Sequence, residues 1–380
     1  MPDFPFHILS GSKLKELQDA THSAERKFSE TAELLEAQRG IADATLRSMA
    51  EGVLAVDASG KIILANPMIE KMFTITQPEV IGKSVREATR NNEIAALVEG
   101  ALREGKKVSS EINIVVPFEA SFVAHASPMT DSDGQIAGLV CVLHDISELK
   151  KLETYRSEFI ANISHELKTP LTVIRNYVET LLNGAIEDKE HNIEFLQKID
   201  KYAISLTDLI SDILELSHLE SKKELGAFSE VDLGKIMKKA IETVMPKIEK
   251  KKIKLITKCD QSEHKINGIE EHIFRAILNL LDNAVNYTGD GGTIEISCEK
   301  KEGQYAIHIA DTGIGIPAEH HHRIFERFYR VDKARSRDLG GTGLGLAIVK
   351  HVMHLHNGSV TLESESGKGA RFTLFFPLES

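Results

Sequence analysis

The chain has 380 residues, with 46 lysines and arginines against 57 aspartates and glutamates, which gives a formal net charge of -11 at pH 7. At this length we expect two or three domains, each large enough for a core of its own. The acidic balance excludes a typical nucleic-acid-binding protein, because such proteins carry a basic face.

The longest nearly unbroken apolar run, Ile136 to Leu143, is too short to cross a bilayer, and Met1 to Ser10 lacks the pattern of a signal peptide. Cys141, Cys259 and Cys298 have neither metal-ligand nor redox spacing, so we expect a reducing compartment. The chain is therefore predicted to be cytoplasmic, and any membrane contact would come through an upstream segment that it lacks.

A polar, helix-favouring stretch runs from about Leu14 to Leu46. Its apolar residues fall on two tracks with a seven-residue repeat, namely Leu14, Phe28 and Leu35 on one and Leu17 and Ala24 on the other. This weak heptad pattern predicts a helix that pairs with a second copy and leads into the next domain. The alternative is a solvated single helix.

From Met49 the pattern changes to short alternating runs with a glycine turn at Ala58-Ser-Gly60, which is typical of a hairpin. We expect strands at Gly52–Asp57 and Lys61–Asn66, helical segments at Pro67–Phe73 and Val85–Arg103, and three more strands between Val108 and His144.

A mixed sheet with helices on one side resembles a PAS sensor domain, in which the Asp-x-x-Gly turn, the Asn66 position and an ending like Asp145-Ile-Ser-Glu148 recur. Asp145 can cap the start of the following helix while Glu148 reaches back. We interpret His125, His144 and Cys141 as packing residues of strands rather than as haem ligands or redox groups.

After Glu148 a helical pattern continues without a breaker. One apolar stripe with a period of 3.6 residues contains Ile160, Ile163, Leu167, Leu171, Ile174, Val178 and Leu181. His165 lies roughly 200° around the helix from Ile163, at about 100° per residue, so it is predicted to face solvent. Thr169, four residues on, shares its face, and Pro170 predicts a kink.

A solvent-facing imidazole beside a carboxylate can act as a nucleophile, because the acid accepts the proton while the other ring nitrogen attacks. The sequence His-Glu-Leu-Lys-Thr-Pro-Leu-Thr, which begins at His165, resembles the phosphoacceptor box of sensor histidine kinases. The resemblance implies that His165 receives the γ-phosphoryl group of ATP and that Glu166 takes the proton. Thr169 is predicted to orient water for hydrolysis of a phosphoaspartate.

A second helix is expected from about His191 to Leu219, after a bend at Asn183-Gly184. Its apolar face contains Ile193, Leu196, Ala203, Leu206, Ile210 and Ile213. A two-helix hairpin buries too little surface alone, so pairing with a second copy into a four-helix bundle is expected, and the chain is predicted to be a homodimer.

Three pieces far apart in the remaining sequence suit a nucleotide. Asn279 and Asn283 lie one helical turn apart, and amide oxygens suit Mg²⁺. Asp311 follows a strand, where its carboxylate can accept from an exocyclic amine, and Gly313 and Gly315 allow close backbone approach. The glycine-rich turn from Gly340 to Gly345 opens a helix whose free N–H groups suit phosphate.

Together these pieces resemble the nucleotide-binding boxes of the histidine-kinase catalytic domain, with Phe325 to Arg330 as a further box. The resemblance implies that Asn283 is the Mg²⁺ ligand, Asn279 supports the metal, Tyr287 packs on adenine and Asp311 binds the adenine amine. It further implies nucleotide roles for Gly313, Gly315, Arg330, Gly341, Gly343, Gly345 and Thr373.

Asn286 departs from the family, which often has lysine there, and this puts one phosphate contact in doubt. The histidines at 320–322 and at 351, 354 and 356 lack partners at metal-ligand spacing, so we do not interpret them as a metal site.

The sequence thus predicts a multidomain α+β protein whose parts are an N-terminal helical linker (1–46), a mixed α/β PAS sensor domain (47–147), a dimeric four-helix-bundle phosphoacceptor domain (148–222) and an α/β-sandwich ATP-binding domain (223–380). The predicted function is that of a two-component sensor histidine kinase of the phosphate-regulon sensor type, which uses Mg²⁺ and ATP and passes its phosphoryl group to a response regulator. Two alternatives stay open. One is a sensor and phosphatase with little kinase activity, and the other is an ATP-driven clamp protein of the gyrase, Hsp90 or MutL type.

Overall fold

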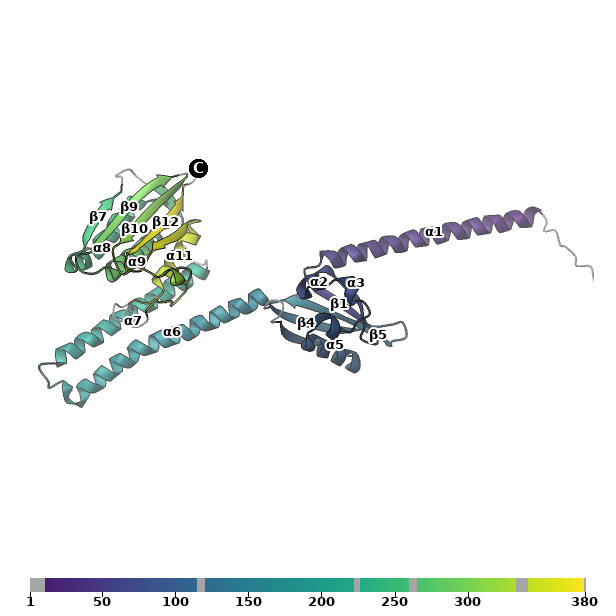
Figure 1. Ribbon diagram of the computed structural model, residues 1–380, viewed down its shortest axis with the longest axis horizontal. Coiled ribbons are helices and arrows are strands. Elements are labelled where there is room, and N and C mark those ends of the chain that lie inside the picture. The colour runs from purple at the N-terminus through teal and green to yellow at the C-terminus, as the bar shows by residue number, and fades with distance from the viewer. Residues whose placement is uncertain are drawn as a thin grey trace, which may run out of the picture. The chain divides into compact units, whose positions relative to one another are not determined.

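The computed structural model describes residues 11–114, 120–221, 226–259, 265–301, 303–332 and 341–378 (Figure 1). The chain divides into two compact units, Met1–Arg156 and Ser157–Ser380. Lys222, where the phosphoacceptor domain was predicted to end, and Gly340, where the glycine-rich turn was predicted to begin, lie outside the described residues. Among the helices that are described, none is long and apolar enough to cross a bilayer.

The first unit contains a long N-terminal helix followed by a mixed domain. The elements are α1 (Gly11–Ser48), β1 (Gly52–Asp57), β2 (Ile62–Ala65), α2 (Pro67–Phe73), α3 (Gln77–Val80), α4 (Val85–Thr89), α5 (Asn92–Glu104), β3 (Val108–Ile114), β4 (Ala120–Thr130) and β5 (Ile136–Asp145). The strands form an antiparallel sheet in the order β2-β1-β5-β4-β3. The predicted hairpin and the three later strands are confirmed.

Asn66 joins three segments of this unit. Its side chain is 2% exposed, and its Oδ1 accepts hydrogen bonds from the N–H groups of Val53 (2.9 Å) and Ile69 (3.2 Å). Its Nδ2 donates to the carbonyls of Leu46 and Glu51. A buried amide satisfied on both sides fixes the end of α1 against β1 and caps α2, which explains in physical terms why an asparagine suits this position.

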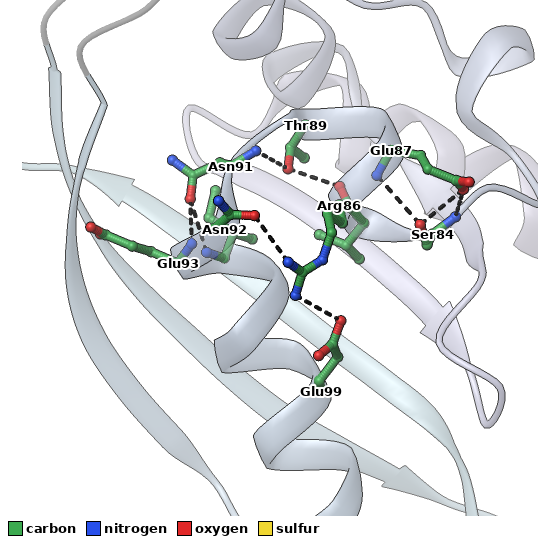
Figure 2. Close-up of polar contacts among 10 residues, drawn as sticks. Ser84, Arg86, Glu87, Thr89, Asn91, Asn92, Glu93 and Glu99 are labelled. Carbon is green, nitrogen blue, oxygen red and sulfur yellow. Dashed lines mark hydrogen bonds and ion pairs between the residues drawn. The ribbon is translucent and has the colours of Figure 1, made fainter.

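The helical segment predicted at Val85–Arg103 is in fact two helices, α4 and α5 (Figure 2). Arg90 ends α4 in the left-handed region at φ 52°. Asn91 then caps α5, because its side chain accepts from the N–H groups of Glu93 and Ile94. The sequence analysis predicted one segment because an asparagine can also lie inside a helix. Asn91 starts a new helix here because the residue before it, Arg90, leaves the helical conformation.

Arg86 holds the two short helices together at this corner (Figure 2). Its guanidinium donates to Asn92 Oδ1 at 3.0 Å and lies 3.5 Å from a carboxylate oxygen of Glu99. Ser84 and Glu87 form a reciprocal capping box at the start of α4, and the hydrogen bonds from Ser84 lower the pKa of the Glu87 carboxyl.

The three residues interpreted as packing residues of strands lie on β4 and β5. Cys141 is fully buried, and burial raises the pKa of its thiol to about 12. His125 Nδ1 lies 2.7 Å from Ser109 Oγ, and His144 Nδ1 lies 3.2 Å from a Glu51 oxygen. An unreactive thiol and two imidazoles with local partners agree with that interpretation.

Helix α6 (Ser147–Thr180) continues the chain from the sensor domain into the phosphoacceptor segment, as predicted. Asp145 Oδ1 accepts from the Ser147 N–H at 2.8 Å near its start. The helix continues through the buried Pro170 without ending. A π-helical turn, η1 (Leu181–Ala185), with Gly184 at φ 110°, then leads to α7 (Asn192–Ser221), and α6 and α7 lie side by side (Figure 1).

The rest of the second unit is a sheet with helices packed on one face (Figure 1). The elements are β6 (Ser229–Asp232), α8 (Leu233–Lys250), β7 (Lys254–Lys258), β8 (Lys265–Gly268), α9 (Glu270–Tyr287), β9 (Thr293–Lys301), β10 (Gln304–Asp311), η2 (Ala318–His320), α11 (Gly345–Leu355), β11 (Ser359–Ser364) and β12 (Ala370–Pro377). The main sheet has the order β11-β12-β10-β9-β7, and β6 pairs with β8. One core joins α8, α9 and α11 to this sheet and includes the end of α7.

Cys259 and Cys298 form a disulfide, which their spacing in the sequence did not predict and which disagrees with the expectation of a reducing compartment. The parallel pairing of β7 with β9 places Lys258 opposite Ser297, so the next residue on each strand is a cysteine. A spacing of 39 residues carries no such signal in the sequence, because only the strand pairing brings the two sulfurs together.

His356 ends α11 with its side chain 4% exposed. Its Nδ1 donates to the Val352 carbonyl at 2.7 Å, and its Nε2 accepts from the Ile269 N–H at 2.9 Å. The ring must be neutral to accept at Nε2, and burial lowers the pKa of His356, although the bond to Val352 acts in the opposite direction.

We expect His356→Leu to destabilise the protein by about 1–3 kcal/mol at pH 8, since the buried Ile269 N–H loses its acceptor. The folded-state pKa of His356 is below the unfolded value of about 6.5, so its contribution is complete above that pH and is lost as pH falls toward the folded pKa. Thermal unfolding from pH 8 to pH 5 should show the gap between wild type and variant narrowing. A constant gap would contradict the assignment, and His354→Leu, at an exposed position on the same helix, is the control.

Candidate active site

A cavity of about 600 Å³ lies in the second unit, between α7, α9, the loop before α11 and β12. Nine of the residues predicted to contact nucleotide line it, namely Asn279, Asn283, Tyr287, Asp311, Gly315, Arg330, Gly341, Gly343 and Gly345. They come from segments separated by up to 66 residues, so the fold brings together what the sequence shows only as separate motifs.

Asn279 and Asn283 lie on α9 and present their amides to the cavity. Asn279 Nδ2 donates to the Gly345 carbonyl at 3.3 Å, which leaves its amide oxygen available. Over the residues that can be described, no cluster of three or more His, Cys, Asp or Glu side chains could hold a metal ion. A Mg²⁺ ion here would therefore take amide oxygens from the chain and its other ligands from phosphate and water, which suits this donor set.

Asp311 ends β10 and is held in one orientation. Its Oδ1 accepts from the Gly313 N–H at 2.8 Å. Burial raises the pKa of Asp311, although the N–H groups of Gly313 and Ala370 act in the opposite direction. Asp311 is one of the residues that line the cavity, where a carboxylate can accept from an amine.

The glycines beside Asp311 are required for close backbone packing. A Cβ on Gly313 would lie 2.4 Å from the Tyr287 carbonyl oxygen, and one on Gly315, at φ 65°, would lie 2.0 Å from the Glu365 carbonyl oxygen. Gly313 is not among the residues that line the cavity and packs closely between Tyr287 and Asp311, and its contact with nucleotide stays a prediction.

The structure does not place Thr373 with the other predicted residues. Its hydroxyl lies 2.9 Å from His308 Nδ1, on the face of the sheet opposite its neighbour Phe372. Ala370 and Phe372 of the same strand line the cavity instead. Because side chains alternate along a strand, an error of one residue in the assignment moves the side chain to the other face.

The predicted phosphoacceptor residues lie on α6, outside the set that lines the cavity. His165 and Thr169 are exposed, as the helical period predicted. The Thr169 hydroxyl donates to the His165 carbonyl at 3.1 Å, which leaves its oxygen lone pairs toward solvent. The predicted nucleophile is thus accessible but separate from the cavity that the predicted nucleotide residues line.

Glu166 contacts the nucleotide-binding part directly. A carboxylate oxygen lies 3.0 Å from Arg330 Nη2, and the Arg330 side chain is only 8% exposed. Phe328, two residues earlier at φ 60°, packs its ring on Phe159 of α6 at 5.8 Å. Arg330, predicted to reach the phosphates, therefore lines the cavity while it also binds the carboxylate next to His165.

Three cations near the cavity were not found by the sequence analysis. Lys251 donates to the carbonyls of Val285, Asn286 and Thr288, which satisfies the last turn of α9 and fixes the end that carries Tyr287. Lys247 pairs with Asp282 at 2.6 Å, and Arg275 pairs with Asp212 at 2.6 Å. These partners lie 34 or more residues away from the cations, so no local signal could have found them.

The histidine clusters have local partners. His320 Nδ1 lies 2.7 Å from the Tyr329 hydroxyl, and His321 Nε2 lies 2.9 Å from the Ile316 carbonyl. His351 lies 3.6 Å from Glu220, and burial lowers its pKa. Their roles in the structure are contacts within the loops and helix ends around the cavity.

Three protein-family models match successive parts of the chain. Residues 42–146 match the PAS fold, residues 155–222 match the His Kinase A (phospho-acceptor) domain, and residues 268–380 match the histidine kinase-, DNA gyrase B- and HSP90-like ATPase. The chain belongs to the sensor histidine kinases. The matched phosphoacceptor model includes His165, and the matched ATPase model includes every predicted nucleotide residue.

Individual relatives agree with this assignment. The sensor protein kinase WalK of Staphylococcus epidermidis is 30% identical over 377 residues, which cover 98% of this chain and 60% of WalK. The sensor-like histidine kinase SenX3 of Mycolicibacterium smegmatis is 40% identical over 249 residues, which cover 66% of this chain and 64% of SenX3, in line with the resemblance to phosphate-regulon sensors. The chain thus spans about three fifths of the length of these curated relatives.

Among solved structures, histidine kinase ThkA in complex with response regulator protein TrrA is 22% identical to this chain. The match covers 88% of this chain and 98% of that one, with a TM-score of 0.49.

The close approach of backbone around Asp311 gives a test with a matched control. Gly367 and Gly369 have nearly the same φ, 81° and 82°, but a Cβ on Gly369 would lie 1.9 Å from the Asp311 carbonyl oxygen, whereas nothing lies within 4 Å of one on Gly367. We expect Gly367→Ala to cost about 1 kcal/mol of stability and Gly369→Ala at least about 3 kcal/mol, with loss of nucleotide binding. Thermal unfolding of both variants would measure this, and equal costs would contradict the described packing.

Proposed function

We propose that this protein binds Mg·ATP in the cavity of the second unit, transfers the γ-phosphoryl group to His165 and passes it on to an aspartate of a response regulator. The observation that carries the proposal is the pairing of an exposed histidine on α6 with a cavity lined by Asn283, Asp311 and the glycine loop. The boundaries predicted for the four segments are part of this proposal. The packing of α8 and β7 into the same core as α9 supports a start near residue 223 for the ATP-binding domain.

In the proposed reaction a ring nitrogen of His165 forms a bond to phosphorus while the bond to the bridging oxygen of ADP breaks. The proton on the other ring nitrogen passes to Glu166, a contribution on the order of 10²–10⁴ in rate for a well-placed base. One carboxylate oxygen of Glu166 is paired with Arg330 in the structure. Opening of that ion pair would free both oxygens for His165 and allow Arg330 to turn toward the phosphates.

Different residues of the cavity bind different parts of the nucleotide in this proposal. Asp311 selects adenine through its amine, Tyr287 packs on the base, and the N–H groups at the start of α11 hold the phosphates. Asn283, with support from Asn279, would hold a Mg²⁺ ion, which would neutralise charge on the phosphate oxygens. The chain contributes mainly by positioning, because phosphoryl transfer needs little further chemistry from the protein.

Exposed apolar side chains on the hairpin support a homodimer. Ile160 and Leu171 of α6 and Leu196 and Ile210 of α7 are 45–59% exposed in the single chain, although they belong to the predicted apolar faces. A second copy that covers these faces would complete a four-helix bundle. The same hairpin would present His165 to the response regulator.

The alternatives differ in what they require of α6. An ATP-driven clamp protein shares the ATPase family match but needs no phosphoacceptor helix, so the match of residues 155–222 counts against it. A sensor and phosphatase with little kinase activity would keep both parts, and measurement of the labelling rate decides between it and the kinase.

We infer a cytoplasmic location, because ATP and response regulators are found there. The disulfide between Cys259 and Cys298 counts against it, since such bonds are rare in the cytosol. The requirement for ATP is the stronger argument.

His165→Ala is expected to abolish incorporation of label from γ-labelled ATP, while affinity for ATP stays within about twofold, because the nucleophile lies outside the cavity. Asn283→Ala is the complementary variant, and it should lose Mg²⁺-dependent nucleotide binding. Incubation with labelled ATP, together with a binding titration, measures both effects. Acid-labile label on His165→Ala would overturn the assignment of the nucleophile.

Thr169→Ala is expected to keep autophosphorylation within a few-fold but to lose most of the stimulated dephosphorylation of the regulator, because its neutral hydroxyl orients the attacking water. Thr172→Ala is a matched control, since Thr172 is exposed on the same helix and its hydroxyl bonds the Lys168 carbonyl in the same way. The decay of phosphorylated regulator measures the effect. Equal decay with wild type and Thr169→Ala would remove Thr169 from the mechanism.

A further inference from the structure

Helix α7 belongs to the phosphoacceptor hairpin, but its second half packs into the nucleotide-binding part. Leu209 and Leu216 are 4% and 0% exposed within that core, and Asp208 and Asp212 line the nucleotide cavity. Asp212 is itself 6% exposed. A buried carboxylate needs partners, and the proposed reaction makes no use of this one.

Both oxygens of Asp212 have partners in the nucleotide-binding part. Oδ1 lies 2.6 Å from Nη2 of Arg275 on α9, and Oδ2 accepts from the Thr342 hydroxyl at 2.7 Å. Arg275 also lies 3.0 Å from a Glu215 oxygen, and burial raises the pKa of Glu215 to about 7. The positive charge of Arg275 therefore offsets the negative charge of Asp212. This reduces the repulsion between the Asp212 carboxylate and a phosphate bound nearby.

Thr342 lies in the loop 341–345, whose backbone is predicted to hold the phosphates. Its Oγ1 also accepts from the Leu344 N–H at 3.2 Å. A carboxylate can only accept, so the hydroxyl proton must point toward Asp212 and a lone pair is left for Leu344. The Thr342 hydroxyl therefore links Asp212 to the backbone of the turn that precedes α11.

The other side of the turn is held independently. The Gly343 carbonyl accepts from the Phe328 N–H at 2.9 Å, and Gly343 has φ 75°, a conformation that glycine adopts at little cost. With both sides fixed, the start of α11, where Gly345 and Leu346 line the cavity, needs little further ordering to bind a phosphate.

We propose that Asp212 is a positioning residue for the phosphate loop, acting through Thr342, so that a helix of the phosphoacceptor hairpin completes the nucleotide site. The inference rests on the proposed function, since it takes the cavity to be an ATP site. It adds that nucleotide affinity depends on a contact from outside the nucleotide-binding domain. Any movement of α7 that breaks the contact would weaken ATP binding.

The test uses the full chain and a fluorescent ATP analogue in binding titrations. Thr342→Val keeps the shape of the side chain but removes the hydroxyl, and it should lower affinity about tenfold or more, as loss of a hydrogen bond to a charged group does. Thr342→Ser should restore affinity to within about twofold of wild type. Asp200→Asn, which changes an exposed carboxylate on the same helix that does not line the cavity, is the matched control and should change affinity less than twofold.

A double-mutant cycle separates positioning from general stability. Asp212→Ala should lower affinity by about as much as Thr342→Val, and the double variant should be no weaker than either one, because all three lose the same contact. Additive losses, or an unchanged or tighter affinity in Thr342→Val, would overturn the proposal. Failure of the proposed function is distinguishable, since wild type would then not bind the analogue at all.

Discussion

The proposed nucleophile and the proposed nucleotide cavity of this protein come from different elements, and partly buried ion pairs between those elements hold them in one unit. Glu166 on α6 binds Arg330, and Asp212 on α7 binds Arg275. Each pair joins a helix of the hairpin to a residue that lines the cavity. Because such pairs are costly to bury and costly to break singly, they favour discrete arrangements over gradual ones.

The ion pair between Glu166 and Arg330 offers a physical reason why His165 lies outside the cavity. While Arg330 binds Glu166, one oxygen of the proposed base is engaged and His165 is exposed to solvent. In the proposed reaction, transfer requires that the nucleotide-binding part release α6 and present the γ-phosphoryl group to His165. The continuous helix α6, which begins directly after the sensor domain, is the element through which a signal could act on that exchange.

The sequence predicted the elements and most of the site because the relevant signals are local. The period of α6 placed His165 and Thr169 on the solvent side, and the motif residues from Asn279 to Gly345 gather around one cavity. What it missed depends on pairing between distant segments. The facing of Thr373 depends on the register of β12, the disulfide depends on the pairing of β7 with β9, and the carboxylate–arginine pairs depend on how the hairpin packs. The break between α4 and α5 depends on neighbouring residues, but it requires a positive φ at Arg90. Arginine rarely adopts this conformation, so the sequence pattern does not indicate it.

The central claim is that phosphate moves from the nucleotide in the cavity to an exposed ring nitrogen on α6. Mass-spectrometric peptide mapping under alkaline conditions, after incubation of the full chain with Mg·ATP, tests it most directly because phosphohistidine survives alkali. The account predicts one phosphoryl group on the peptide that contains His165. Hydrolysis of ATP with no phosphoryl group on that peptide would contradict it.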